Sequence, residues 1–196
     1  MGIGSEKEQT VLPSDTEIRV PAAETFTADI VHFSGDMKLR VVLMGEGASC
    51  HIRCVYLSSG ADKNHIGIEV VHQSPNTSSV QEIRGILTDE STMDFAGVIR
   101  IPPDVQKCDG AQNHRAFLLS DNALVRATPE LEIFADDVKC AHGSAIGPLD
   151  KTQLFYFLSR GIDQKTAEKM LLKGLIADLI PTDFTPYIEE WMTQHV

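Results

Sequence analysis

The sequence predicts a mainly β protein with a small α-helical domain at its C-terminus. From about residue 17 to residue 148, short runs rich in Val, Ile and Phe alternate with polar turn clusters, which is typical of strands. After residue 148 the apolar residues recur at helical spacing. Hydrophobic residues make up 42% of the chain, enough for a globular core. We therefore expect a flexible lead-in over residues 1–16, a β body over residues 17–148 and a helical domain over residues 149–196.

The β body shows its strands as short apolar runs, several of which alternate apolar and polar residues. The runs include EIRV, KLRVVLM, CHIRCVYL, HIGIEVV, VQEIRGIL, TMDFAGVIRI, HRAFLL and LEIFA. The breaks between them include GEG, SSGADKN, SPNTSS, TDES, PPD, DGAQN, SDN, TPE and ADD. In ASCHIRCVYL, Cys50, Ile52 and Cys54 share one face, so one buried face per strand is expected. Without a strict internal repeat, a β-solenoid and a β-sandwich fit this pattern equally well.

Three helices are expected in the C-terminal domain. Asp150 followed by Gln153 matches a capping box, and Gly161 can end the helix that follows. Asp163 can cap a second helix that Pro181 ends. The apolar face of this second helix is expected to comprise Ala167, Met170, Leu171, Gly174, Leu175 and Leu179.

The third helix is expected to begin at Thr185-Pro186, as a cap and a first-turn proline, and to run through Trp191. The domain carries more apolar surface than one helix packing face needs. The surplus residues are Leu171, Leu172, Leu175, Ile176, Leu179 and Ile180. Docking onto the β body and binding of a partner protein both explain that surplus.

The charge balance restricts the partners of the protein. Its 17 basic and 28 acidic residues give a net charge of −11, which argues against nucleic acid and against an anionic membrane surface. No apolar run approaches the roughly 20 residues of a membrane span. The polar start MGIGSEKEQT does not resemble a signal peptide, so the cytoplasm is the expected location. In that compartment the four cysteines are expected to be thiols.

Cys140 and His142 are the candidate ligands in the stretch DDVKCAHGSAIG, and they point to one side if a strand runs through them. Thiolate and imidazole bind iron or zinc, yet two ligands make at most half of a site. The alternative is a strand end in which Cys140 is packed inward. Cys50 and Cys54 lie roughly 13 Å apart on an extended strand and are expected to be buried hydrophobes.

Two further residues have weaker signals. Cys108 falls in the expected turn KCDGAQN and is interpreted as exposed, whereas His72 falls in an apolar phase and is interpreted as a buried, hydrogen-bonded histidine. The chain contains no GxSxG, GxxxxGK[ST] or GxGxxG motif. A hydrolytic or nucleotide-driven activity of this chain alone is therefore not expected, and we do not expect an enzyme.

Residues 113–176 resemble the C-terminal half of the SufB/SufD family. The matching motifs are LLS with Ala123, then P-x-LEI-x-ADDV-x-C-x-HG ending at Gly143, then LFYFLSRGI. Upstream, HQSPNTSSVQEIRGIL resembles the H-x-x-x-N-T-S segment of the family. The resemblance implies an iron–sulfur cluster assembly scaffold with a right-handed parallel β-helix core. It also implies a SufB-like partner chain or a second copy, and a SufC-like ATPase docked on the helical domain.

The resemblance also implies roles for particular residues. The SufB branch has an acceptor cysteine where this chain has Ala123, and a glutamate where it has Cys140. The ADDVKC-x-HG form indicates the SufD branch, with His142 and Cys140 as contributors to a transient cluster at a dimer junction and no permanently bound cofactor. The expected ATPase contacts are Phe155, Tyr156, Arg160, Leu171 and Leu175. The alternative is a non-catalytic or homodimeric β-helix adaptor without cluster ligands of its own.

Overall fold

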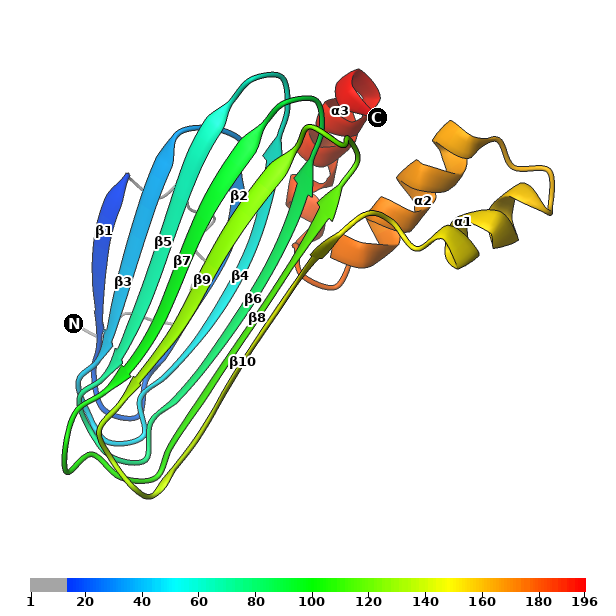
Figure 1. Ribbon diagram of the computed structural model, residues 1–196. Coiled ribbons are helices and arrows are strands. Elements are labelled where there is room, and N and C mark those ends of the chain that lie inside the picture. Colours follow the sequence, from blue (N-terminus) through cyan, green and yellow to red (C-terminus); the bar gives the residue numbers. More distant parts are fainter. Residues whose placement is uncertain (1–13) are drawn as a thin grey trace.

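The computed structural model describes residues 14–196 and shows a solenoid of parallel strands followed by helices. One sheet is ordered β1 (Asp15–Val20), β3 (Asp36–Leu43), β5 (Lys63–His72), β7 (Thr92–Ile101) and β9 (Leu124–Ile133). The facing sheet is ordered β10 (Val138–Gly147), β8 (Cys108–Leu118), β6 (Ser78–Leu87), β4 (Ser49–Ser58) and β2 (Thr25–His32). Each turn of the chain adds one strand to each sheet (Figure 1). The sandwich alternative is therefore excluded, and the mainly β fold with a C-terminal helical part is confirmed.

The turns of the solenoid differ in length, which explains why the sequence shows no strict repeat. Asp36 pairs with His65 and His65 pairs with Asp94 at equal spacing along the chain. Asp94 then pairs with Arg126, after a longer turn. Because a solenoid requires a matching register only between neighbouring strands, the loops that connect the strands can differ in length.

Inward-facing side chains from the two sheets form the core. In β4 the side chains of Cys50, Ile52 and Cys54 are buried, as the alternation predicts. Two predicted breaks are wrong, because DGAQN lies within β8 and TPE lies within β9. β2 was not singled out by the sequence pattern. DGAQN and TPE have the polar composition of turns, but here their polar residues are part of strands, so the composition misled the prediction.

The helical part comprises α1 (Lys151–Leu158), α2 (Gln164–Ile176), the short η1 (Thr182–Phe184) and α3 (Thr185–His195). The predicted caps of the first two helices are confirmed: the Thr152 N–H donates to Asp150 and the Thr166 N–H donates to Asp163. Gly161, with a φ of +80°, follows the end of α1 as predicted, and α3 begins at Thr185 with Pro186 in its first turn, also as predicted. Two other limits were wrong. α2 ends at Ile176, well before Pro181, and α3 is preceded by Phe184 as its cap and continues to His195.

Helices α2 and α3 cover the outer face of the β2–β10 sheet near the C-terminal ends of its strands. Leu172 and Ile176 of α2 and Trp191 of α3 pack on Val55 and Leu57 of β4. The expected face of α2 was therefore partly wrong, because Leu172 and Ile176 are buried while Met170 and Gly174 are exposed. α1 and the N-terminal end of α2 project away from the solenoid (Figure 1), and α1 has no buried residue. No helix in residues 14–196 is long and apolar enough to cross a membrane.

Candidate functional site

The last turn of the solenoid forms an open end. β10 pairs with β8, and β9 pairs with β7; within residues 14–196 neither has a strand on its other side. Such edge strands present free backbone N–H and C=O groups to any chain that approaches. The inward-facing side chains of this turn are therefore exposed at the end of the core.

Cys140 and His142 both lie on β10, on the face that points into the solenoid. Their register partners are Gly110 and Gln112 of β8. The Cys140 Sγ lies 3.2 Å from the position that a Cβ on Gly110 would take, so Gly110 leaves room for the thiol. Cys140 is half-buried and His142 is exposed. Burial raises the pKa of the Cys140 thiol; a hydrogen bond with the Gly110 backbone acts against this to a smaller extent, and Cys108 and Asp109 add smaller increases.

These two side chains do not form a complete metal site. In the part of the chain that the structure describes, no three His, Cys, Asp or Glu side chains come together to hold a metal ion. The predicted burial of Cys50 and Cys54 is confirmed, and desolvation raises the pKa of each to about 12. A thiol with that pKa is a poor source of thiolate at neutral pH, so neither is suited to ligate iron.

Cys108 is placed differently from the prediction. It is 2% exposed, lies in strand β8 and forms a hydrogen bond of 3.3 Å with the Thr77 hydroxyl. Its side chain belongs to the same apolar cluster as Cys140. The expectation of an exposed turn residue was wrong because the apolar and small residues of β8 alternate with polar ones from Cys108 onward.

A row of buried polar side chains inside the solenoid was missed by the sequence reasoning. His114 forms hydrogen bonds with Tyr56 at 2.8 Å and with Ser144 of β10 at 3.1 Å. In the neighbouring row, the Gln112 Nε2–H donates to Gln81 Oε1 at 2.8 Å. The period-two series Cys108, Gly110, Gln112, His114 was the available signal. It was hidden because DGAQN was interpreted as a turn.

His72 was predicted to be buried and hydrogen-bonded, and this is confirmed. Its Nδ1 and Nε2 lie 2.9 Å from the hydroxyls of Thr77 and Ser79 respectively. Desolvation lowers the pKa of His72 and of His114 to about 4 in each case. Both imidazoles are therefore neutral at physiological pH.

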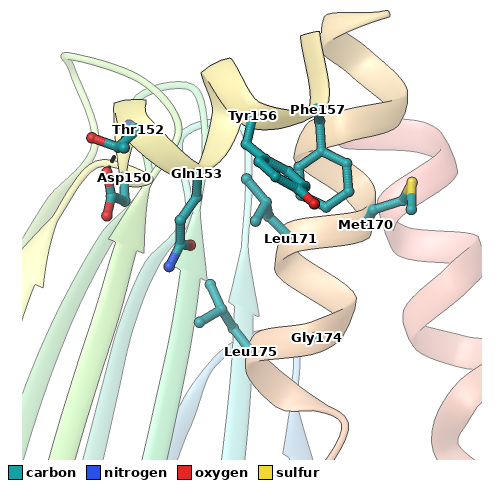
Figure 2. Close-up of a pocket in the computed structure, with 9 residues that line it drawn as sticks. All are labelled: Asp150, Thr152, Gln153, Tyr156, Phe157, Met170, Leu171, Gly174 and Leu175. Atoms are coloured by element: carbon teal, nitrogen blue, oxygen red, sulfur yellow. Dashed lines mark hydrogen bonds between the residues drawn. The ribbon is translucent and has the colours of Figure 1, made fainter. Parts of the chain in front are cut away.

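An apolar groove of about 570 Å³ lies between α1 and α2 (Figure 2). Tyr156 and Phe157 of α1 and Leu171 and Leu175 of α2 point into it, with Met170 at its rim (Figure 2). Tyr156 is 53% exposed, and the Arg160 guanidinium carbon lies 3.6 Å from its ring centroid. The groove thus presents aromatic and aliphatic surface to solvent.

The structure brings together four of the five expected ATPase contacts. Tyr156, Leu171 and Leu175 line the groove, and Arg160 stacks on Tyr156. Phe155 is 68% exposed and is not among the residues that line the groove. Whether these residues contact an ATPase stays a prediction.

The fold and site define a class: a parallel β-solenoid with an open end carrying a cysteine–histidine pair, and a projecting helical hairpin. The family described as "SUF system FeS cluster assembly, SufBD core domain" matches residues 5–175 of this chain. The chain therefore belongs to the SufB/SufD family.

Within this family the chain is similar to SufD proteins. It is 37% identical over 108 residues to the iron–sulfur cluster assembly protein SufD of Escherichia coli K12, covering 55% of this chain and 26% of that protein. It is 28% identical over 138 residues to SufD of Bacillus subtilis 168, covering 70% of this chain and 32% of that protein. It is 39% identical over 102 residues to the chloroplastic protein ABCI7 of Arabidopsis thaliana, covering 52% and 22%. The matches thus cover a third or less of these relatives' length.

Proposed function

We propose that this chain is a SufD-like, non-enzymatic component of the SUF iron–sulfur cluster assembly machinery. In this proposal its open end pairs with a SufB-type chain or with a second copy, and the helical hairpin docks a SufC-type ATPase. Cys140 and His142 contribute to a cluster that is built and handed on, so the cluster is cargo rather than a resident cofactor. The proposed compartment is the cytoplasm, where thiols stay reduced.

One observation carries the cluster role. The candidate ligands lie two residues apart on edge strand β10, whose outer side has no partner strand within residues 14–196, and they are too few to complete a site. A neutral imidazole and a thiolate are iron ligands. A second chain that pairs along β10 would bring further ligands to this place, because strand pairing fixes the distance between two edges.

The test is cluster assembly by this chain together with a SufB-type and a SufC-type protein. His142→Ala should lose assembly measured as iron and sulfide bound after anaerobic reconstitution. His65→Ala is the matched control, since His65 is a partly exposed histidine on β5 in the other sheet. Assembly by His142→Ala at the wild-type level would remove His142 from the cluster site.

The ATPase role is supported by the hairpin. Its groove is apolar and open, and α1 is not packed on the solenoid, so a partner helix could occupy the space between the two helices. ATP-driven approach of two docked ATPase subunits would then move the hairpins and strain the junction between the two β-helices.

A second candidate is an adaptor that binds the ATPase and the partner but holds no cluster ligand. Ala123, which stands where the SufB branch has its acceptor cysteine, is 6% exposed within the core, so this chain offers no thiol there. Reconstitution of this chain alone separates the two candidates. A cysteine-to-iron absorption band that disappears in Cys140→Ser argues against the adaptor, and its absence in the wild type argues for it.

A further inference from the structure

Gln112 has an unused hydrogen-bond acceptor in the interior of the solenoid. Its side chain is 3% exposed, and its Nε2–H donates to Gln81 Oε1 at 2.8 Å. Its Oε1 has no hydrogen-bond partner within residues 14–196, and neither has the Nε2 of Gln81. Buried polar atoms in native proteins are nearly always paired, because an unpaired one keeps its full desolvation cost. A donor is therefore needed close to the Gln112 Oε1.

The register of the strands places His142 beside this atom. His142 of β10 is the register partner of Gln112 of β8. Within residues 14–196, β10 is the only strand next to β8 on the side of the open end. Strands in a sheet lie about 4.8 Å apart, so side chains at paired positions on one face are within reach of a hydrogen bond. The imidazole of His142 carries an N–H that can donate to the Gln112 Oε1.

The side chains on either side of His142 already make contacts of this kind. Two residues before it, the Cys140 thiol lies against Gly110 of β8. Two residues after it, Ser144 forms a 3.1 Å hydrogen bond with its own register partner His114. Since alternate residues of a strand share a face, His142 faces the interior as Cys140 and Ser144 do. One coil further from the open end, Gln81 and Gln112 are also register partners, and a side-chain hydrogen bond joins them.

We propose that Gln112 is a positioning residue for His142: its Oε1 accepts a hydrogen bond from one ring N–H and thereby selects a single imidazole tautomer. The other ring nitrogen is then unprotonated and its lone pair is available at the open end of the solenoid. Histidine ligands of metals are commonly oriented by such a second hydrogen bond. The inference rests on the proposed role of His142 at the cluster junction for its functional meaning, but not for its geometry.

The test measures the tautomer of His142 in this chain by NMR with ¹⁵N-labelled histidine, at a pH where the ring is neutral. In the wild type the tautomer ratio should depart from that of free histidine by about fivefold or more, since a net hydrogen bond has about that effect on an equilibrium; this departure is the bias that the variants test. Gln112→Met should abolish the bias. Methionine is unbranched and suits the space of the amide, which lies over Gly97. Gln112→Glu, which keeps the acceptor, should preserve the bias.

Asn113→Ala is the matched control and should leave the tautomer unchanged, because Asn113 is the next residue on β8 and is exposed on the opposite face. A wild-type His142 with the tautomer mixture of a free histidine overturns the inference without any variant. A bias that persists in Gln112→Met also overturns it.

Cluster assembly measured on the same variants separates this inference from the proposed function. A fixed tautomer lost in Gln112→Met, together with normal assembly by His142→Ala, supports the positioning and rejects the cluster role. Loss of assembly in His142→Ala, together with no tautomer bias in the wild type, supports the cluster role and rejects the positioning by Gln112.

Discussion

The hydroxyl oxygen of Tyr56 lies 2.8 Å from Nε2 of His114 in the interior of the solenoid, and Nδ1 of the same ring is bonded to Ser144. The ring also stacks on Phe95, with 4.7 Å between the ring centroids. One imidazole therefore links β4, β8 and β10, and its protonation affects both the core and the end of the solenoid.

Stability is expected to fall as the pH is lowered from about 6.5 to about 4. Desolvation lowers the pKa of His114 and His72 to about 4, while the unfolded chain takes up these protons near pH 6.5. Between these values the unfolded state binds more protons, so the free energy of unfolding decreases with decreasing pH. Each histidine should lower the free energy of unfolding at pH 5 by about 2 kcal/mol relative to pH 7. Urea unfolding at both pH values measures this difference.

The histidine origin of this effect is checked with His114→Gln. Glutamine does not titrate, so the difference in unfolding free energy between pH 7 and pH 5 should shrink by roughly the share of one histidine. An unchanged difference in this variant means that His114 is not responsible.

Gly85→Ala is expected to destabilise the protein by about 1–3 kcal/mol, because the core has no room for the added methyl group. A Cβ at Gly85 would overlap the ring of Tyr56, which is 0% exposed and cannot turn away. Chemical unfolding measures the change. Gly147→Ala is the control, since a Cβ there meets no atom within 4 Å and should change stability little. Equal effects of the two substitutions would show that Tyr56 does not restrict position 85.

Cys140 is expected to be the first thiol to react with a thiol reagent in the native protein. Cys50, Cys54 and Cys108 are each 3% exposed or less, whereas Cys140 is half-buried at the open end. In denaturant all four thiols should react. The fast phase should be missing in Cys140→Ser; a fast phase that remains would place a different cysteine at the surface.

Tyr156→Ala is expected to weaken binding of a SufC-type ATPase by about tenfold, a loss typical of an aromatic residue at the centre of an interface. Tyr156 projects into the groove between α1 and α2 (Figure 2). Tyr187→Ala is the matched control, because Tyr187 is 60% exposed on α3, outside the groove. Binding is measured by calorimetry with purified proteins. If both variants bind equally, the groove is not the docking surface.

The alternation in β4 and the caps Asp150 and Asp163 could be predicted from sequence, because each depends on neighbours within a few residues. The end of α2 was misjudged, since Ile176 ends the helix where the chain turns against the solenoid rather than at Pro181. The burial of Gln112 and Cys108 was missed for a related reason. The segment KCDGAQN that contains them has the composition of a loop. Only the strands that pair with β8 in the neighbouring coils of the solenoid make them interior residues.

The sequence by itself determined the class of this protein: strand-forming runs, two capped helices and the motif that contains Cys140 and His142. These are local patterns, each carried by residues that are close together in the chain. Only the tertiary structure decided that Cys140 and His142 lie on a strand whose outer side has no partner strand within residues 14–196, and that Gln112 is the register partner of His142. It also decided that Tyr56, His114 and Ser144 form one row. Each of these depends on register between strands far apart in the chain, which backbone pairing sets and side-chain composition does not reveal.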